Sequence, residues 1–317
     1  MNSTAADPID VVVRDVESIA DDCIALVLER PGGGELPSWE PGAHIDLVMG
    51  GGLTRQYSLC GDPADTASWR IGVLREPNSR GGSIYLHDRV QAGSELIAQG
   101  PRNHFPLVRS SRYLFVAGGI GITPILTMVR AAEAAGSDWR LLYGGRRRES
   151  MAFVGELEKY GDRVLVRPED EYGLLDLADF LDGAGSDTAV YCCGPEPLIA
   201  AMEQACESAW LPLHVERFAP KPVVSTVVNE EFEVVCEASG ITVTVPADST
   251  IIAEVRKAGV EVLSSCSEGT CGTCETDIIE GVPDHRDSVL TPEDRKAGES
   301  MMICVSRCIG KRLVLDL

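Results

Sequence analysis

The first hundred residues alternate between apolar and polar positions with the period of two that is typical of β-strands. Clusters of glycine and proline, such as Pro31-Gly32-Gly33-Gly34, separate the apolar runs. This pattern predicts a small antiparallel barrel, interrupted by one helix at Ser83–Arg89. The expected strands are Ile9–Ser18, Cys23–Leu28, Ala43–Val48, Gln56–Leu59 and Trp69–Leu74.

From residue 112 onward, short apolar strands alternate with amphipathic helices. Strand–helix alternation of this kind builds a parallel, doubly wound α/β sheet. Strands are expected at Tyr113–Ala117, 139–143, 163–167, 188–192 and 213–217. Helices are expected at Pro124–Ala135, 151–159, 174–182 and 196–209.

A third segment follows a stretch that has two prolines and no periodic pattern. It begins with alternating strands at 231–236 and 241–245 and a helix at 250–258, and then reaches a group of cysteines. We therefore expect a multidomain chain. The expected domains are a barrel at 1–108, an α/β domain at 109–220, a linker at 221–229 and a C-terminal domain at 230–317.

Four cysteines in the C-terminal segment carry the strongest chemical signal. The first three follow the spacing C-x4-C-x2-C and the fourth comes further along the chain: Cys266, Cys271, Cys274 and Cys304. This is the plant-type spacing for four thiolates around a [2Fe–2S] cluster, in which one loop supplies three sulfurs and a distant strand the fourth. Gly269 and Gly272 lie within the loop, where glycine lets the backbone approach the cluster.

Two alternatives to this set of ligands stay open. A structural zinc site usually combines two short cysteine or histidine pairs, whereas this segment has one. Cys308 is a rival fourth ligand, although the run Met301-Met302-Ile303-Cys304 reads as a buried strand and favours Cys304. The cysteines without ligand-like spacing are expected to be buried small hydrophobic residues: Cys23, Cys60, Cys192, Cys206, Cys236 and Cys308.

A flavin is expected because a [2Fe–2S] cluster accepts one electron at a time, whereas a nicotinamide gives up two as a hydride. On the strand that contains Arg55, Tyr57 and Ser58, the tyrosine could lie flat on an isoalloxazine ring and the serine hydroxyl could reach its N5. Arg55 would bind the flavin phosphate. Gly81, Gly82 and Ser83 would open a helix whose first N–H groups also bind phosphate.

Two strand-to-helix turns predict a nicotinamide nucleotide site. Gly118-Gly119-Ile120-Gly121-Ile122-Thr123-Pro124 offers glycines that let a pyrophosphate approach the backbone at the start of a helix. Cys193-Gly194-Pro195 follows another strand, at the end of the sheet where ligands bind. Three arginines at 146–148 could hold a 2′-phosphate and favour NADPH; alternatively, Arg146 contacts the adenosine of NADH.

The motifs occur in the order Arg-x-Tyr-Ser, Gly-Gly-Ser, Gly-Gly-Ile-Gly-Ile-Thr-Pro, Cys-Gly-Pro and the cysteine group. This order resembles the phthalate dioxygenase reductase and vanillate demethylase reductase family, from about residue 8 to residue 317. The resemblance implies a flavin-binding barrel, a NAD-binding α/β domain and a C-terminal β-grasp ferredoxin domain. It also implies FMN rather than FAD, NADH as the usual donor, and a Rieske-type terminal oxygenase as the partner.

The resemblance also assigns roles to individual residues. Cys193 would lie beside the nicotinamide, with a buried inert thiol as the alternative. Phe218 would cover the flavin until the nicotinamide displaces it, with core packing as the alternative. Ser58, Cys193 and Phe218 are the expected catalytic residues. The residues expected at the flavin or nicotinamide are Arg55, Gln56, Tyr57, Ser58, Leu74, Arg75, Gly81, Gly82, Ser83, Gly118, Gly119, Gly121, Thr123, Pro124, Arg146, Cys193, Gly194, Pro195 and Phe218.

Charge and composition narrow the range of partners. The net charge of −21 argues against binding nucleic acid, although a few acidic side chains could steer a basic protein partner. No apolar run reaches the length of about 18 residues that a membrane-spanning helix needs. The N-terminus lacks the features of a signal peptide, so we expect a cytoplasmic protein. We also expect it to be a monomer.

Two other functions are consistent with these motifs. The chain could be a stand-alone NAD(P)H-dependent flavin reductase whose iron domain is structural, or a redox-sensing subunit. The substrate of a terminal oxygenase would be chosen by that other protein, so this sequence does not name it.

Overall fold

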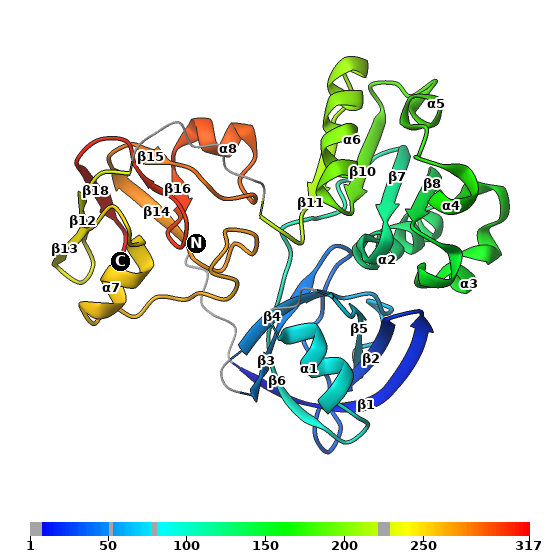
Figure 1. Cartoon of the computed structure of the whole chain (residues 1–317), viewed down its shortest axis with the longest axis horizontal. Helices are drawn as coiled ribbons and strands as arrows, with labels where there is room; N and C mark the ends of the chain where they lie inside the picture. Colours follow the sequence, from blue (N-terminus) through cyan, green and yellow to red (C-terminus); the bar gives the residue numbers. More distant parts are fainter. Residues whose placement is uncertain (1–7, 51–52, 78–80, 221–228) are drawn as a thin grey trace. The chain divides into compact units, whose positions relative to one another are not determined.

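The computed structural model describes residues 8–50, 53–77, 81–220 and 229–317. These residues form two compact units, one ending at Phe218 and the other starting at Ala219, and each is described by itself (Figure 1). Arg80 and most of the expected linker, residues 221–228, lie outside the described residues.

The first unit starts with an antiparallel barrel. Its elements are β1 (Ile9–Ala20), β2 (Cys23–Glu29), β3 (His44–Met49), β4 (Leu53–Ser58), β5 (Ser68–Leu74), α1 (Gly82–Arg89) and β6 (Glu95–Arg102). The strand order is β4-β3-β6-β1-β2-β5, and a bridge between Leu59 and Ile71 joins the two edges, so the sheet closes. The barrel and its helix are confirmed. The pattern did not predict β6, because Gly100-Pro101 interrupts its apolar run.

A parallel five-stranded sheet with helices follows, and the predicted α/β fold is confirmed. The strand order is β11-β10-β7-β8-β9. The strands are β7 (Arg112–Gly118), β8 (Asp138–Gly145), β9 (Val164–Pro168), β10 (Thr188–Cys193) and β11 (Leu213–Glu216). The helices are η2 (Gly119–Gly121), α2 (Ile122–Ala134), η3 (Arg148–Ser150), α3 (Val154–Leu157), η4 (Glu158–Arg163), α4 (Glu169–Tyr172), α5 (Leu177–Leu181) and α6 (Glu196–Ala209).

Two of the predicted helices are shorter than expected. Over 151–159 the helix starts only at Val154, because Phe153 has a left-handed backbone with a φ of 63°. Over 174–182 it starts at Leu177, where the Asp176 side chain accepts a hydrogen bond from the N–H of Asp179 and caps the first turn.

The barrel and the α/β sheet share one hydrophobic core. Cys60 of the barrel packs in the same cluster as Phe115 of β7. A charged network reinforces this joint: Arg70 of β5 donates to Glu156 at 2.5 Å, and Arg130 of α2 contacts the same carboxylate. The second half of α2 is therefore anchored to the barrel, where Arg130 also donates to the carbonyl oxygens of Cys60 and Gly61.

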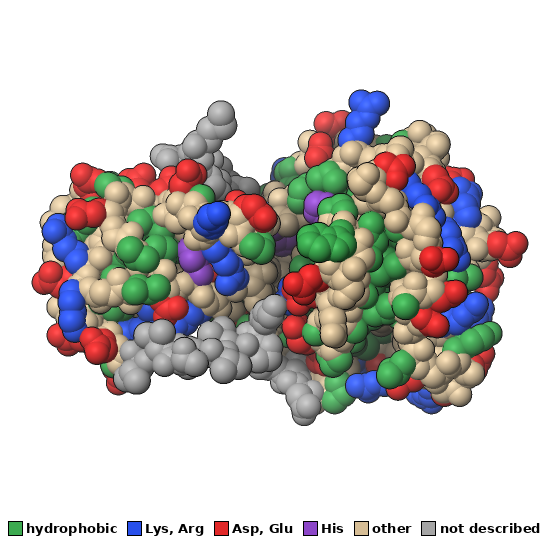
Figure 2. Space-filling view, turned by 90° about the horizontal axis from the view of Figure 1, so that it is seen from above, with side chains coloured by type: hydrophobic (Ala, Val, Ile, Leu, Met, Phe, Trp, Pro, Cys, Tyr) green, Lys and Arg blue, Asp and Glu red, His purple; other side chains and the backbone are tan. Residues whose placement is uncertain are grey.

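The second unit has a mixed five-stranded sheet in the order β13-β12-β18-β14-β16. Its elements are β12 (Phe232–Cys236), β13 (Ile241–Val245), α7 (Ile251–Lys257), β14 (Glu275–Glu280), β15 (Pro283–Asp284), α8 (Pro292–Ala297), β16 (Ser300–Met302), β17 (Arg307–Cys308) and β18 (Arg312–Leu315). The last strand pairs in parallel with the first, which is the β-grasp arrangement predicted for the C-terminal domain. On the face seen in Figure 2, acidic side chains are spread over this unit among hydrophobic ones.

Candidate functional site

The loop between α7 and β14 brings the four predicted ligand cysteines together. Cys271, Cys274 and Cys304 are buried and Cys266 is half-buried. The segment before Cys304 is held against the loop, because the N–H of Ile303 donates to the carbonyl oxygen of Cys274 at 3.3 Å. Cys304 therefore reaches the loop from the strand that runs beside β14.

Three pairs of these thiols interact and change each other's pKa: Cys266 with Cys271, Cys266 with Cys304, and Cys274 with Cys304. Cys266 accepts from Cys271 and Cys304, which lowers the pKa of Cys266 and raises the pKa of both donors. A hydrogen bond with Cys304 likewise lowers the pKa of Cys274. Thiols arranged in this way form a compact set of soft sulfur donors, which is the ligand chemistry of an iron–sulfur cluster.

The backbone of the loop is shaped to surround these sulfurs. The N–H of Glu268 points to Cys266 Sγ at 3.3 Å and the N–H of Thr273 points to Cys271 Sγ at 3.4 Å. Gly269 and Gly272 both have a φ of 71°, which side chains other than glycine rarely adopt. The loop thus fits a cluster that needs close backbone approach and N–H groups directed at sulfur.

The structure separates Cys308 from this group. Cys308 is half-buried on β17, where its Sγ lies 3.4 Å from the carbonyl oxygen of Arg312. The prediction of buried cysteines outside the ligand set is confirmed for the other five: Cys23, Cys60, Cys192, Cys206 and Cys236.

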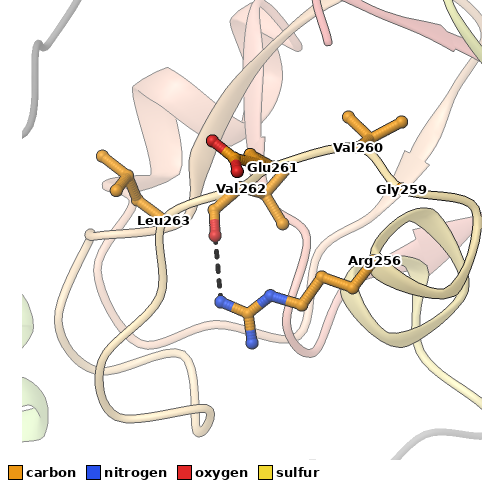
Figure 3. A pocket seen from close by; sticks show the side chains of 6 residues that line it. All are labelled: Arg256, Gly259, Val260, Glu261, Val262 and Leu263. Carbon is orange, nitrogen blue, oxygen red and sulfur yellow. Dashed lines mark hydrogen bonds between the residues drawn. The ribbon is translucent and has the colours of Figure 1, made fainter.

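A surface pocket lies just before the cysteine loop (Figure 3). It has a volume of about 660 Å³, and its lining includes Arg256 and Val262. Arg256 Nη2 donates to the carbonyl oxygen of Val262 at 2.9 Å and to Ser264 Oγ at 2.6 Å, so it anchors the chain that enters the loop to α7. None of the residues predicted for the flavin or the nicotinamide lines this pocket.

The predicted flavin residues meet at the start of α1. A Cβ atom on Gly82 would lie 2.4 Å from Arg55 Cγ, so glycine is required for Arg55 to cross the beginning of the helix. Gly81 has a φ of 99°, and Ser83 Oγ accepts the backbone N–H of Glu76 at 3.1 Å. A guanidinium beside helix N–H groups is a cradle that fits a phosphate.

The other predicted residues of the barrel differ in their contacts. Burial raises the pKa of Tyr57 well above its ordinary value. Its half-buried ring packs against the core of the barrel. Gln56 donates to Asp46 at 2.9 Å, and the Arg75 guanidinium is paired with Asp88 at 2.6 Å. Leu74 packs against the core that the barrel shares with the α/β sheet.

The two predicted nucleotide turns pack directly on each other. A Cβ atom on Gly121 would lie 2.3 Å from the carbonyl oxygen of Cys193, and one on Gly118 would lie 2.7 Å from Pro195 Cδ. The glycines thus allow two strand ends to approach within backbone contact. Thr123 is buried and donates to the carbonyl oxygen of Ile120 at 2.9 Å, which stabilises the turn, and Pro124 is buried in the first turn of α2.

Three arginines follow β8, and the structure distinguishes them. Arg147 lies 3.7 Å from Asp21, and Arg148 lies 3.2 Å from Glu158. Arg146 is exposed and makes no side-chain ion pair with the described residues. Of the three, Arg146 has the side chain that is free to meet a nucleotide.

Glu216 joins the barrel to the α/β sheet, and the sequence did not single it out. Its carboxylate accepts a hydrogen bond from Ser58, and Oε2 is buried with no partner among the described residues. Burial raises the pKa of Glu216 to about 8, so the group can hold a proton near neutral pH. The available signal was its place near the end of the expected strand 213–217, because ligands bind at that end of a parallel sheet.

Two of the predicted catalytic residues, Ser58 and Cys193, lie close to this carboxyl group. Cys193 is fully buried, and burial together with the charge of Glu216 raises the pKa of its thiol, so the thiol stays protonated. Ser58 is nine-tenths buried. Phe218, two residues beyond Glu216, is 46% exposed and is therefore not a core residue.

Comparison with known proteins agrees with this arrangement. A family described as a 2Fe-2S iron-sulfur cluster binding domain matches residues 234–308. The chain is 42% identical over 313 residues to phenoxybenzoate dioxygenase subunit beta of Ectopseudomonas oleovorans, covering 98% of both chains. It is 38% identical to vanillate O-demethylase oxidoreductase of a Pseudomonas species, covering 98% of this chain and 100% of the relative.

Solved structures extend the comparison. Phthalate dioxygenase reductase, described as a modular structure for electron transfer from pyridine nucleotides to [2Fe–2S], matches with a TM-score of 0.72 and 35% identity over 98% of both chains. An intact type IV self-sufficient cytochrome P450 monooxygenase matches with a TM-score of 0.91 and 43% identity. In that case 98% of this chain spans 41% of the larger protein.

A closed barrel, a parallel nucleotide-binding sheet and a β-grasp unit with four convergent cysteines define a flavin- and NAD-dependent iron–sulfur reductase. The chain belongs to the family of phthalate dioxygenase reductase and vanillate O-demethylase oxidoreductase. Across the described residues, no helix has both the length and the apolar composition needed to cross a membrane.

Proposed function

We propose that this chain is the reductase component that carries electrons from NADH to a Rieske-type terminal oxygenase. The observation that carries the proposal is the convergence of four cysteine sulfurs in a chain that also has a flavin-type barrel and a nucleotide sheet. Relatives that match nearly the whole chain include phenoxybenzoate dioxygenase subunit beta and a carnitine monooxygenase reductase subunit, which supports an oxygenase as the acceptor.

The barrel would hold FMN. Arg55 and the N–H groups at the start of α1 would bind its phosphate, and the half-buried Tyr57 would support the ring. Bound flavin supplies the conversion of one two-electron hydride into two single-electron transfers. FMN rather than FAD is what the resemblance to this family implies, and mass spectrometry of the released flavin distinguishes FMN from FAD.

The glycine turn at 118–121 and the turn at 193–195 would hold the nicotinamide nucleotide. Ser58 and Glu216 share a hydrogen bond at the junction of barrel and sheet, so the carboxyl group can hold a proton beside the site of hydride transfer. Cys193 would contribute a neutral, buried thiol, and Phe218 an exposed ring that can move aside. These are the catalytic roles proposed for Ser58, Cys193 and Phe218.

NADH is the proposed donor. Arg147 and Arg148 pair with acidic side chains of this chain, which leaves Arg146 for the adenosine part of the nucleotide rather than an arginine cluster for a 2′-phosphate. We expect kcat/KM to be higher for NADH than for NADPH. A preference for NADPH would contradict this assignment.

The four cysteines would bind the [2Fe–2S] cluster, with Cys304 as the fourth ligand. The domain limits we propose are 1–108, 109–220 and 230–317, and we propose a cytoplasmic monomer, which light scattering of the purified protein can check.

The test of the proposed function separates hydride transfer from single-electron transfer. The purified protein is expected to show flavin and iron–sulfur absorbance and to reduce cytochrome c with NADH. Cys266→Ser is expected to keep the bleaching of flavin absorbance by NADH and to lose cytochrome c reduction. A variant that keeps full cytochrome c reduction without a cluster would instead support a stand-alone flavin reductase.

A further inference from the structure

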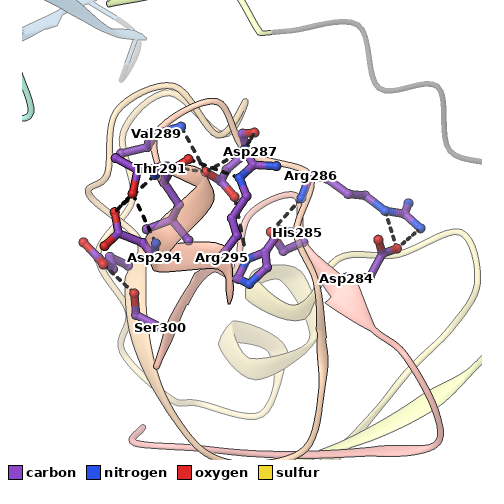
Figure 4. Close-up of polar contacts among 12 residues, drawn as sticks. Asp284, His285, Arg286, Asp287, Val289, Thr291, Asp294, Arg295 and Ser300 are labelled. Atoms are coloured by element: carbon purple, nitrogen blue, oxygen red, sulfur yellow. Dashed lines mark hydrogen bonds and ion pairs between the residues drawn. The ribbon is translucent and has the colours of Figure 1, made fainter. Parts of the chain in front are cut away.

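A buried carboxylate lies between β15 and α8 of the second unit (Figure 4). Asp287 is 3% exposed, and its Oδ1 accepts the backbone N–H groups of Val289 and Leu290 at 2.9 and 2.8 Å. Arg295 of α8 donates to the backbone carbonyl oxygen of Asp287, and its Nη2 lies 3.5 Å from Oδ1. The carboxylate is thus held in one orientation by its own segment and by α8.

The second oxygen of this carboxylate, Oδ2, is buried and receives no hydrogen bond from the described residues. His285 Nδ1 lies 3.9 Å away on a side chain that is 8% exposed. Burial lowers the pKa of His285, so the ring is neutral at neutral pH and adds no positive charge. Leaving a buried charged oxygen without a hydrogen-bond partner costs free energy, so its presence here indicates a functional role.

The same segment is in direct contact with the cysteine loop. The N–H of Ser288 donates to the carbonyl oxygen of Gly269 at 2.7 Å. A Cβ atom on Gly269 would lie 3.0 Å from Asp287 Cα and 2.6 Å from Val305 Cγ2. Gly269 lies between Cys266 and Cys271, and Val305 follows Cys304. The backbone of Asp287 therefore packs closely against the backbone that connects Cys266 to Cys271.

We propose that Asp287 is a positioning residue of the iron–sulfur site, which shapes the loop at 266–271 and places a negative charge against it that Arg295 meets at Oδ1 only. The inference rests on the proposed cysteine ligands. A fixed negative charge beside a redox centre disfavours the addition of an electron, so Asp287 keeps the midpoint potential of the cluster low. A low potential favours onward transfer to an acceptor.

The test uses the full-length holoprotein and two substitutions of nearly equal shape. Asp287→Asn removes the charge but keeps an oxygen that accepts the two backbone N–H groups. Asp284→Asn is the matched control, because Asp284 lies on the same segment and is paired with Arg286 at 2.6 Å. We expect the midpoint potential of the cluster to shift to a more positive value in Asp287→Asn and to stay at the wild-type value in Asp284→Asn.

A second variant tests the shaping role. Asp287→Ala removes the acceptor of both N–H groups, so we expect altered g values in the electron paramagnetic resonance spectrum of the reduced cluster, with Asp287→Glu closer to wild type. If Asp287→Ala does not fold, the midpoint potential of the cluster in Asp287→Asn alone tests the inference. Unchanged potential and spectra in all variants of a wild type that holds a cluster would overturn this inference alone. A wild type without a cluster would overturn the proposed function as well.

Discussion

At the scale of single residues, the chemistry of the site depends on which groups are taken out of water. Cys304 and Cys308 are four positions apart, yet one shares hydrogen bonds with the other cysteines and the other contacts a carbonyl oxygen at 3.4 Å. Glu216 and Cys193 are both shifted by burial toward their protonated forms. Identical side chains thus acquire different roles from their surroundings.

The two cysteines give the first prediction. Cys304→Ser is expected to lose most of the bound iron and sulfide, because serine replaces one of four thiolate ligands. Cys308→Ser is expected to keep both at the wild-type content. Iron and acid-labile sulfide analysis checks this, and the reverse result would make Cys308 the fourth ligand.

Glu216 gives a prediction about pH. Because its pKa is raised from 4.5 to about 8, the folded state binds a proton that the unfolded state has released between these values. The free energy of unfolding should therefore fall by up to about 1.4 kcal/mol per pH unit as pH rises through this window. Glu216→Gln cannot ionise and is expected to lose this dependence. Denaturant unfolding at pH 5, 6, 7 and 8 measures it, and parallel curves for both proteins would refute the assignment.

At the scale of elements, the ends of helices and strands position the binding groups. The turn before α2 and the turn before α6 are packed together so tightly that glycine is the residue that fits at positions 118 and 121. At the start of α1, glycine is likewise the residue that fits at position 82, because the Arg55 side chain passes close to it. These contacts link elements that are far apart in the sequence.

Gly82→Ala tests the cradle at α1. The added methyl group would lie 2.4 Å from Arg55 Cγ, so Arg55 must move. Overpacking of this kind costs roughly 1–3 kcal/mol, which corresponds to about a five- to 150-fold weaker flavin affinity if the strain is relieved by moving Arg55. Gly155→Ala is the control, since nothing lies within 4 Å of its added methyl group. Fluorescence titration of the apoprotein with FMN measures both, and equal affinities would remove Arg55 from the phosphate site.

At the scale of the whole molecule, the distribution of charge bears on the partner. From residue 230 to the C-terminus the chain has 17 acidic and 8 basic residues, a net charge of −9. A surface of one sign accelerates the encounter with a partner of the opposite sign and does so less in salt.

We expect reduction of a basic acceptor protein to slow as ionic strength rises from 0.01 to 0.5 M, because the Debye length shortens from about 30 Å to only a few ångströms over this range. Stopped-flow reduction of cytochrome c measures the effect, with an uncharged quinone as the control acceptor. A rate that does not respond to salt would remove electrostatic steering.

Much of this molecule follows from local sequence. Period-two alternation predicted five barrel strands, strand–helix alternation predicted the α/β sheet, and the cysteine spacing predicted the four sulfurs that the fold brings together. Such signals are local because backbone geometry and the reach of one loop determine them. The pattern did not predict β6, whose run contains Pro101. It also placed two helix starts too early: the left-handed backbone of Phe153 delays the start of α3, and the Asp176 cap fixes the start of α5.

Tertiary structure decided what depends on contacts between distant segments. The raised pKa of Glu216 comes from its burial where the barrel meets the sheet, and the hydrogen bond from Ser58, which is 158 positions earlier in the chain, acts in the opposite direction. The contact between Asp287 and the loop at Gly269 exists only in the folded β-grasp unit. Burial and through-space electrostatics set these properties, and neither is encoded in residue type or spacing alone.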